Sequence, residues 1–191
     1  MNEVVIREIR SADYKDIYLL NQEFNPKLYL FSSEMVKERI DFIINNTKDI
    51  IFVSEQGNEV IGYIHGSPYE LLFSDSLVNV LGFVVKEKYR NNGVGSKLID
   101  SLECWAKDNS FSGIKLLTHP KRIDAHRFYE RHGYIHTKDQ KNYMKLFRWK
   151  CPEFCVNPGI IYFLNNRMSD FSSIRLFVLY HLIFIESIRI F

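Results

Sequence analysis

Cysteine, N-terminal apolar residues and excess charge of one sign are all scarce in this chain of 191 residues. The three cysteines, Cys104, Cys151 and Cys155, do not describe a disulfide framework, so we expect a reducing, cytoplasmic location. Cys151 and Cys155 lack the further cysteine or histidine partners of a zinc site, and no metal is expected. The N-terminal segment MNEVVIREIR has acidic side chains and no apolar run, so we expect no signal peptide. A formal net charge of +2 gives no indication of a nucleic-acid partner.

Apolar residues along the chain alternate between strand-like and helix-like spacing. Two β-rich runs, 50–55 and 59–67, flank Gly57 and Asn58 and predict a hairpin whose second strand ends at Pro68. The run 77–85 (LVNVLGFVV) predicts a central strand buried on both faces. Three further strands are expected, over 4–9, after Gly113 and over 143–147. Four helices are expected: two that start near Ser11 or Asp13 and at Ser32 or Ser33, one after Gly95, and one over 124–132 that is capped by Gly133. Cys104 is expected to be buried in the helix after Gly95. This order predicts a mixed α/β (α+β) fold, a sheet with helices on its faces.

The most informative segment joins the strand 77–85 to the helix that follows it. It contains Arg90, Gly93 and Gly95, with the helix beginning directly after the glycines. Unpaired backbone N–H groups at a helix start form a concave, partly positive site, and glycine lets the backbone approach an anion closely. The spacing matches neither the dinucleotide-binding nor the P-loop pattern. A pyrophosphate fits such a loop, and a plain strand–turn–helix connection is the alternative.

A second motif lies downstream, where residues 125–134 read AHRFYERHGY. Together the two motifs resemble those of the GCN5-related N-acetyltransferase (GNAT) family, [QR]-x-x-G-x-[GA] and A-x-x-F-Y-E-x-x-G-[FY]. The resemblance covers about residues 3–148. It implies a mixed, mostly antiparallel sheet of about six to seven strands with helices on both faces. We therefore expect a GNAT domain over 1–149 and an apolar C-terminal extension over 150–191.

The resemblance implies acetyl-CoA as the cosubstrate. The backbone of Phe83 to Val85 is expected to run along the pantetheine, and the amides of Arg90 to Gly95 to hold the pyrophosphate. Lys88, Arg90 and Lys97 are placed to reach a nucleotide phosphate, although a solvated charged face explains them equally well. The full set of expected cofactor-binding residues is Phe83, Val84, Val85, Arg90, Asn91, Asn92, Gly93, Val94, Gly95, Ser96, Lys97 and Phe128.

Three residues are the candidates for the catalytic centre. The resemblance places Tyr129 near the CoA sulfur, where a phenol can give a proton to the leaving thiolate; a core tyrosine is the alternative. Asn79 takes the position at which some relatives carry a glutamate base, and an amide cannot act as one. His65 has the most suitable unperturbed pKa for a base, with Glu70, Asp75 or a relayed water as alternatives. His119 is more in keeping with a structural role.

These residues predict an N-acetyltransferase that transfers acetyl to a primary amine of a small molecule by direct attack in a ternary complex. A protein or peptide acceptor is the second enzymatic hypothesis. A non-catalytic acyl-CoA sensor is the third, which Asn79 favours and Tyr129 opposes. The basic pair Lys121–Arg122 stands where relatives have an asparagine, and it suits an anionic acceptor, the CoA phosphates or simply an exposed helix start.

The end of the chain, 171–191, is dense in isoleucine, leucine and phenylalanine. Four ionisable residues, Arg175, His181, Glu186 and Arg189, interrupt it, so no integral membrane insertion is expected. It is interpreted as a segment that packs on the domain or on a second subunit, as an interfacial helix, or as out-of-frame sequence. The first interpretation is favoured and allows a homodimer.

Overall fold

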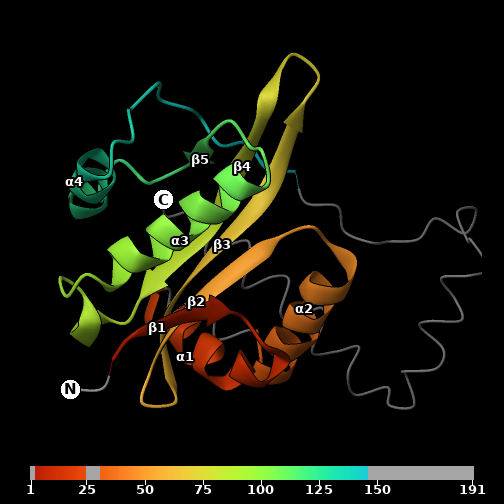
Figure 1. Cartoon of the computed structure of the whole chain (residues 1–191), viewed down its shortest axis with the longest axis vertical. Helices are drawn as coiled ribbons and strands as arrows, with labels where there is room; N and C mark the ends of the chain where they lie inside the picture. The colour runs from red at the N-terminus through yellow and green to blue at the C-terminus, as the bar shows by residue number, and fades with distance from the viewer. Residues whose placement is uncertain (1–2, 25–30, 146–191) are drawn as a thin grey trace, which may run out of the picture. The chain divides into compact units, whose positions relative to one another are not determined.

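The computed structural model of the protein describes residues 3–24 and 31–145. Contacts divide the chain after His136, and every described helix and strand belongs to the first unit, Met1–His136. The elements are β1 (Val5–Glu8), the 3₁₀ turn η1 (Ser11–Asp13), α1 (Tyr14–Phe24), α2 (Ser33–Asn46), β2 (Ile50–Gln56), β3 (Glu59–Leu71), β4 (Ser74–Val85), the 3₁₀ turn η3 (Glu87–Tyr89), α3 (Val94–Asp108), β5 (Ile114–Leu116) and α4 (Ile123–Arg131) (Figure 1).

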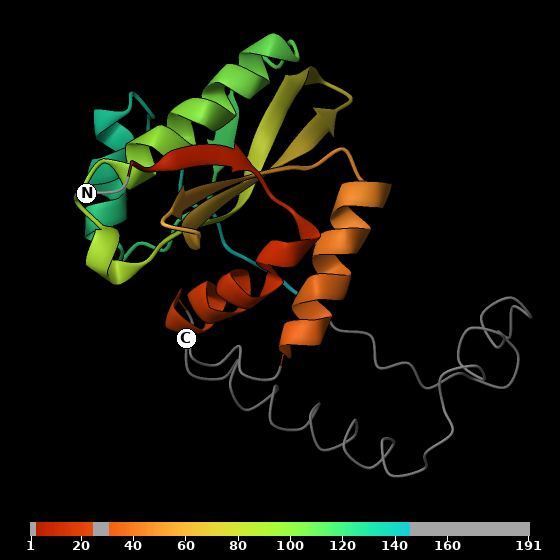
Figure 2. The ribbon, with the colours of Figure 1, turned by 60° about the horizontal axis from the view of Figure 1, so that its bottom comes forward.

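The sheet has five strands in the order β1-β2-β3-β4-β5. The first three pairings are antiparallel and β4–β5 is parallel, which confirms the mixed, mostly antiparallel sheet. Helices α1 and α2 cover one face and α3 covers the other, as Figure 2 shows. Among the described residues the sheet has fewer strands than the six to seven predicted. Of the last strand predicted over 143–147, residues 143–145 are exposed and not in a strand, and residues 146–147 lie outside the described residues.

Local signals in the sequence explain where several elements begin and end. The hydroxyl of Ser32 accepts a hydrogen bond from Met35 N–H at 3.3 Å, so Ser32 is the N-cap of α2. Gly57 and Asn58 have φ values of 61° and 66° and connect β2 to β3. Positive φ at both central residues is the geometry of a tight hairpin turn, so the predicted hairpin is confirmed.

The expectation that Pro68 ends β3 is wrong, because the strand continues to Leu71 with Pro68 opposite Val78. β2 pairs with β3 only as far as Gly66, so beyond that residue β4 is the one strand paired with β3 among the described residues. Proline lacks an N–H donor and is tolerated in a strand with an open edge.

A β-bulge in β4 sets which side chains face which helices. His65 pairs with Gly82 and the next residue of β3, Gly66, pairs with Val80, so Leu81 is the extra residue. Its side chain is 55% exposed, an exception to the burial on both faces that was predicted for this strand. The extra residue shifts the alternation, so Val80 before the bulge and Phe83 after it both pack on the α3 side.

Two apolar clusters lie on opposite faces of the sheet. The cluster under α3 contains Leu98, Ile99 and Leu102, which are fully buried against residues such as Ile64 of β3. The cluster under α1 and α2 joins buried residues of both helices to the other face of the strands; these are Ile17, Leu20, Val36, Ile40, Val53, Val60 and Val84. Between them, the two clusters fix the sheet and α3 as the frame of the domain.

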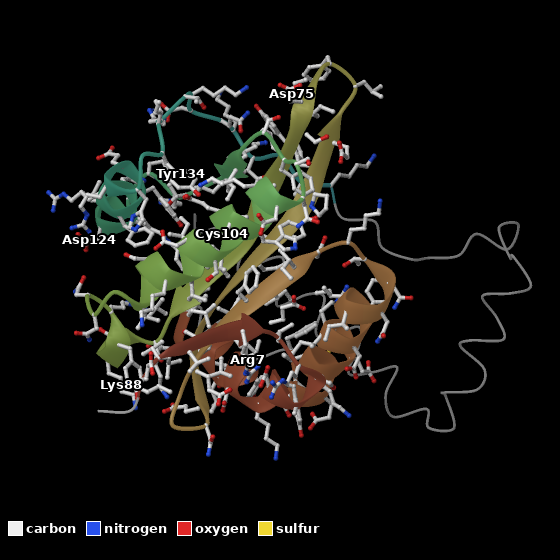
Figure 3. The ribbon with its side chains drawn as sticks, viewed as in Figure 1. Arg7, Asp75, Lys88, Cys104, Asp124 and Tyr134 are labelled. Carbon is white, nitrogen blue, oxygen red and sulfur yellow. The ribbon has the colours of Figure 1, made fainter. Side chains whose placement is uncertain are left out.

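Cys104 is exposed, so its predicted burial is wrong (Figure 3). It follows the buried Leu102 by two residues, a turn of about 200° around the helix at about 100° per residue. Cys104 therefore lies outside the apolar stripe of α3. No helix in the described ranges is long and apolar enough to cross a membrane.

Truncation of Leu102 to alanine should lower the free energy of unfolding by about 2–5 kcal/mol, because it opens a cavity under α3. Cys104→Ala, on the exposed side of the same helix, is the matched control and should stay within about 0.5 kcal/mol of the unmodified protein. Urea unfolding followed by circular dichroism measures both. Equal losses in the two variants would contradict the burial of one side of α3 and the exposure of the other.

Candidate active site

The end of β4 presents open main-chain groups. Parallel pairing with β5 covers Val78–Val80, whereas antiparallel pairing with β3 continues to Val85. The N–H of Lys86 bonds to the Ile61 carbonyl at 2.8 Å. Because hydrogen-bonding directions alternate along an antiparallel strand, the main-chain groups of Phe83 and Val85 point away from β3. They face the side on which β5 has ended and are accessible to an extended polar ligand.

The loop from β4 to α3 turns sharply at two residues in the left-handed region. Asn91 has φ 63°, and Gly93, the N-cap of α3, has φ 77°. Nothing lies within 4 Å of the position that a Cβ on Gly93 would occupy, so backbone conformation and not space explains the glycine there. The turn directs the first N–H groups of α3 toward the same end of the helix, as an anion site requires.

The second glycine of the loop, Gly95, is explained by a close contact and not by its backbone conformation. A Cβ on Gly95 would lie 3.3 Å from Cε2 and 3.4 Å from Cζ of Phe128. The absence of a side chain therefore lets the Phe128 ring of α4 rest directly on the first turn of α3. The loop that is expected to hold pyrophosphate and the helix that carries Tyr129 meet at this contact.

A histidine adds a polar connection beside the same contact. The Nδ1 of His132 lies 2.8 Å from the Phe128 carbonyl and its Nε2 lies 3.0 Å from the Ser96 hydroxyl. A carbonyl can only accept, so Nδ1 carries a proton, and in the neutral ring Nε2 accepts from Ser96. The ring also stacks on Phe128, with centroids 4.2 Å apart. His132 thus fixes the side chain of Ser96, one of the expected loop residues.

Tyr129 lies in an aromatic cluster on the α3 face of the sheet. Its ring centroid is 6.3 Å from that of Phe83, 5.5 Å from Phe128 and 5.9 Å from Tyr134. Burial raises the pKa of Tyr129 above its usual value, and the positive charge of Arg122 opposes that shift. The phenol therefore stays protonated at neutral pH and can donate a proton.

The end of α4 is fixed by Gly133, as predicted. Gly133 has φ 82°, and its N–H bonds to the Glu130 carbonyl at 3.0 Å. The N–H of Tyr134 bonds to the Tyr129 carbonyl at 3.0 Å. This pair of bonds is the Schellman arrangement, and it returns the Tyr134 ring against Tyr129.

His65 and Asn79 belong to the opposite face. His65 of β3 is opposite Gly82, the neighbour of Phe83, and its Nε2 lies 2.9 Å from Asp49 Oδ2. Both side chains are 15% exposed. Asn79 alternates with Val78 and Val80, which face α3, so it is directed to the side of α1 and α2. The sheet therefore separates these two residues from Tyr129, and the open edge of β4 adjoins both faces.

The three cations expected near the nucleotide each have a protein contact. Lys88 lies 3.7 Å from a Glu59 carboxylate oxygen and 4.7 Å from the centroid of the Tyr89 ring. Arg90 Nε donates to the Val85 carbonyl at 3.0 Å, and Lys97 Nζ lies 3.4 Å from the Val4 carbonyl. Arg90 thereby binds an outward-facing carbonyl of β4, which ties the loop to the strand.

The structure thus brings Phe83, Gly95, Ser96, Phe128 and Tyr129 into one cluster. Sequence reasoning gave no role to two residues that organise the site, His132 and Asp49. His132 follows Phe128 by four residues, one helical turn, and that spacing is the signal for its contact. Asp49 has no comparable signal, because only the folded chain brings it to His65.

The loop and the two helices that meet at it are also shared with known proteins. The acetyltransferase (GNAT) family profile matches residues 14–134, which is more than half of the chain. The chain belongs to this family. The match includes the loop with Gly93 and Gly95 and the helix with Phe128 and Tyr129.

Three relatives illustrate the likeness. Streptothricin acetyltransferase A of Bacillus subtilis (strain 168) is 41% identical over 51 residues, which span 27% of this chain and 30% of that protein. Aminoglycoside N-acetyltransferase AAC(6')-Iy in complex with CoA has a TM-score of 0.67 at 17% identity over 76% of this chain and 96% of that chain. A transcriptional regulator from Bacillus halodurans C-125 has a TM-score of 0.68 at 21% identity over 75% of this chain and 100% of that chain. At these identities the two structures show the shared fold.

We predict that Gly95→Ala weakens acetyl-CoA binding, because the new methyl group pushes the Phe128 ring and α4 away from the loop. Overpacking of this kind costs about 1–3 kcal/mol. Calorimetric titration of acetyl-CoA measures the change. In a Phe128→Leu background the same substitution should cost much less, since the ring that it meets is gone. Equal losses in both backgrounds would show that the Gly95–Phe128 contact is not the reason for the glycine.

Proposed function

We propose that the protein is an acetyl-CoA-dependent N-acetyltransferase acting on a primary amine of a small molecule. The proposal rests on three features that adjoin one another: the first turn of α3, the open edge of β4 at Phe83–Val85, and the aromatic cluster around Tyr129. An extended cosubstrate with an anionic end and a reactive thioester end would contact all three. When bound, acetyl-CoA supplies the acetyl thioester that the amine attacks directly in a ternary complex.

Binding of the cosubstrate is assigned to main-chain groups. The loop amides before and within the first turn of α3 hold the pyrophosphate, and the outward groups of Phe83 and Val85 bind the pantetheine. A backbone N–H at this edge is also a suitable donor for the oxygen of the reacting carbonyl. Phe83 and Phe128, whose centroids are 5.7 Å apart, close the apolar side of the path.

Tyr129 is assigned the proton donated to the leaving thiolate. It projects into the aromatic cluster next to Phe83 rather than into bulk solvent, and burial keeps its phenol protonated. Burial raises the pKa of this phenol and the Arg122 charge opposes that shift. The tyrosine that packs against it, Tyr134, has no such role.

His65 is assigned the removal of the amine proton, directly or through a water molecule. The Asp49 carboxylate at 2.9 Å orients the imidazole. His65 lies opposite Gly82, on the face away from Tyr129, so acid and base act from the two sides of the sheet edge. Asn79 cannot take up the proton, and its amide is suited to a hydrogen bond with the acceptor or a water.

A small-molecule acceptor is supported by the named activities of relatives. The curated relative is a streptothricin acetyltransferase and one structural neighbour is an aminoglycoside N-acetyltransferase. A non-catalytic acyl-CoA sensor is the second candidate, favoured by Asn79 in place of a strand glutamate and by the neighbour described as a transcriptional regulator. Thiol release from acetyl-CoA in a screen of amines, beside calorimetric binding of acetyl-CoA, separates the two: binding without release on any amine supports the sensor.

Replacement of Tyr129 by phenylalanine should lower kcat by about 10²- to 10⁴-fold, the range for a lost general acid, with little change in acetyl-CoA affinity. Tyr134→Phe, in the same aromatic cluster, is the matched control and should retain activity, because no part in the transfer is assigned to the buried Tyr134 hydroxyl. Since burial raises the pKa of Tyr129, the tyrosine should cause no loss of activity as pH rises from 7 to about 10. A full rate in the Tyr129→Phe variant would assign the proton to water instead.

His65→Gln should also lower kcat by about 10²-fold or more, and Asp49→Asn by a smaller factor because it removes only the orienting charge. The control is His119→Gln, which replaces an exposed histidine that accepts a hydrogen bond from Lys121 N–H at 3.1 Å. Steady-state kinetics at saturating acetyl-CoA measures all three. If His65→Gln unfolds the protein at lower denaturant concentration but keeps kcat, the His65–Asp49 pair is structural.

A further inference from the structure

Arg122 connects α4 to the opposite face of the sheet. It is the N-cap residue of α4, whose Phe128 and Tyr129 pack on the α3 side. Its guanidinium carbon lies 4.5 Å from the centroid of the Phe24 ring, at the end of α1. Because α1 belongs to the other face, this contact crosses the sheet plane beyond the end of β5, beside the open edge of β4.

Arg122 and Tyr129 lie on the same side of α4. Seven residues separate them, which is two helical turns and a rise of about 10 Å. The influence of the Arg122 charge on Tyr129 agrees with this placement. Two residues contact the glycine loop: Phe128, six residues and about 9 Å further along the helix, and the C-cap residue His132, ten residues and about 15 Å further along.

The charge on Arg122 is not neutralised by a neighbouring acid. Within residues 3–24 and 31–145, no carboxylate lies within 4.0 Å of its guanidinium. Two nearby carboxylates are engaged elsewhere: Glu23, the neighbour of Phe24, accepts from Glu87 N–H at 2.6 Å, and Asp124, two residues after Arg122, lies 3.9 Å from Arg127 (Figure 3). The guanidinium of Arg122 is supported by an aromatic ring while its N–H donors remain available for an anion.

We propose that Arg122 is a specificity-determining residue that selects an acceptor amine bearing a carboxylate or phosphate group. The inference rests on the proposed acetyltransferase function and adds the class of acceptor. A guanidinium held against the Phe24 ring can present paired donors to a planar or tetrahedral anion. Its spacing from Tyr129 suits an acceptor whose anionic group is several bonds from the amine that is acetylated.

A phosphate of the cosubstrate is the other anion that Arg122 could bind. The geometry favours the acceptor, because the loop meets this segment at Phe128 and His132, six and ten residues beyond Arg122, whereas Arg122 itself contacts Phe24 of α1. Measuring acetyl-CoA affinity in the same variants distinguishes the two anions.

The test compares acceptors that differ by one anionic group, γ-aminobutyrate against butylamine and aminoethyl phosphate against ethanolamine. The unmodified enzyme should favour the anionic member of each pair in kcat/KM. Arg122→Gln should lower kcat/KM for the anionic acceptors by about 10- to 100-fold more than for the neutral amines, the loss expected for a charged hydrogen bond, so that the preference within each pair disappears. The acetyl-CoA Kd should not move. Arg127→Gln, an exposed arginine of the same helix, is the matched control and should keep the preference.

Binding of the same amines to the protein–CoA complex, measured calorimetrically, provides a readout that does not need turnover. One possible outcome is that γ-aminobutyrate binds in an Arg122-dependent way but no amine causes thiol release. That result would contradict the proposed transferase activity and still support the recognition of an anionic amine by Arg122. Equal kcat/KM and equal binding for charged and neutral amines would overturn the inference. A rise in the acetyl-CoA Kd of Arg122→Gln with both kinds of amine affected alike would also overturn it and assign Arg122 to the cosubstrate.

Discussion

The early end of the pairing between β4 and β5 is the constraint on which the candidate site depends. β5 pairs with β4 only at Val78–Val80, whereas β4 continues to Val85. The bulge at Leu81 lies where the pairing stops, and it keeps Phe83 on the same face as Val80. If the strand alternated regularly through Leu81 without a bulge, Phe83 would turn toward α1 and α2 and be separated from α4. The open main-chain edge and the aromatic cluster beside it therefore have one common origin.

Helix α4 is attached to the frame more weakly than α3. Five residues of α3 are buried, among them Leu98 and Leu102, whereas α4 has none that is fully buried. The half-buried rings of α4 and the hydrogen bonds of His132 hold it, and such contacts contribute about 0.5–1.5 kcal/mol each. Elements with few buried contacts open locally at a lower free energy than the core does. The proposed acid, Tyr129, is thus carried by the less stable of the two helices that meet at Gly95.

The sequence predicts those parts of the site whose chemistry is local. Gly133 adopts the left-handed conformation of the helix cap that was predicted there, and Gly93, predicted to lie at a helix start, is left-handed as well. Residues recruited from distant segments could not be found in this way: Asp49 meets His65 only because β3 lies beside the start of β2. The wrong predictions that Pro68 ends β3 and that Cys104 is buried have a similar cause. Whether a strand can contain a proline, and whether a helix residue is buried, both depend on which element lies beside that position. A short motif suffices to predict the loop proposed to bind the cosubstrate, because the proposed contacts are made by backbone atoms and only the glycines are recognisable in the sequence.

An open strand edge also has a consequence for the protein without its ligand. Outward-facing N–H and C=O groups on an apolar strand can pair with the backbone of another chain, the first step of edge-to-edge association. The groups of Phe83 and Val85 are of this kind, although Arg90 covers the Val85 carbonyl. A ligand that lies along the edge occupies the same hydrogen-bonding positions and stabilises the folded chain by mass action. Whatever binds at this edge therefore protects the protein from aggregation in addition to any part that it takes in a reaction.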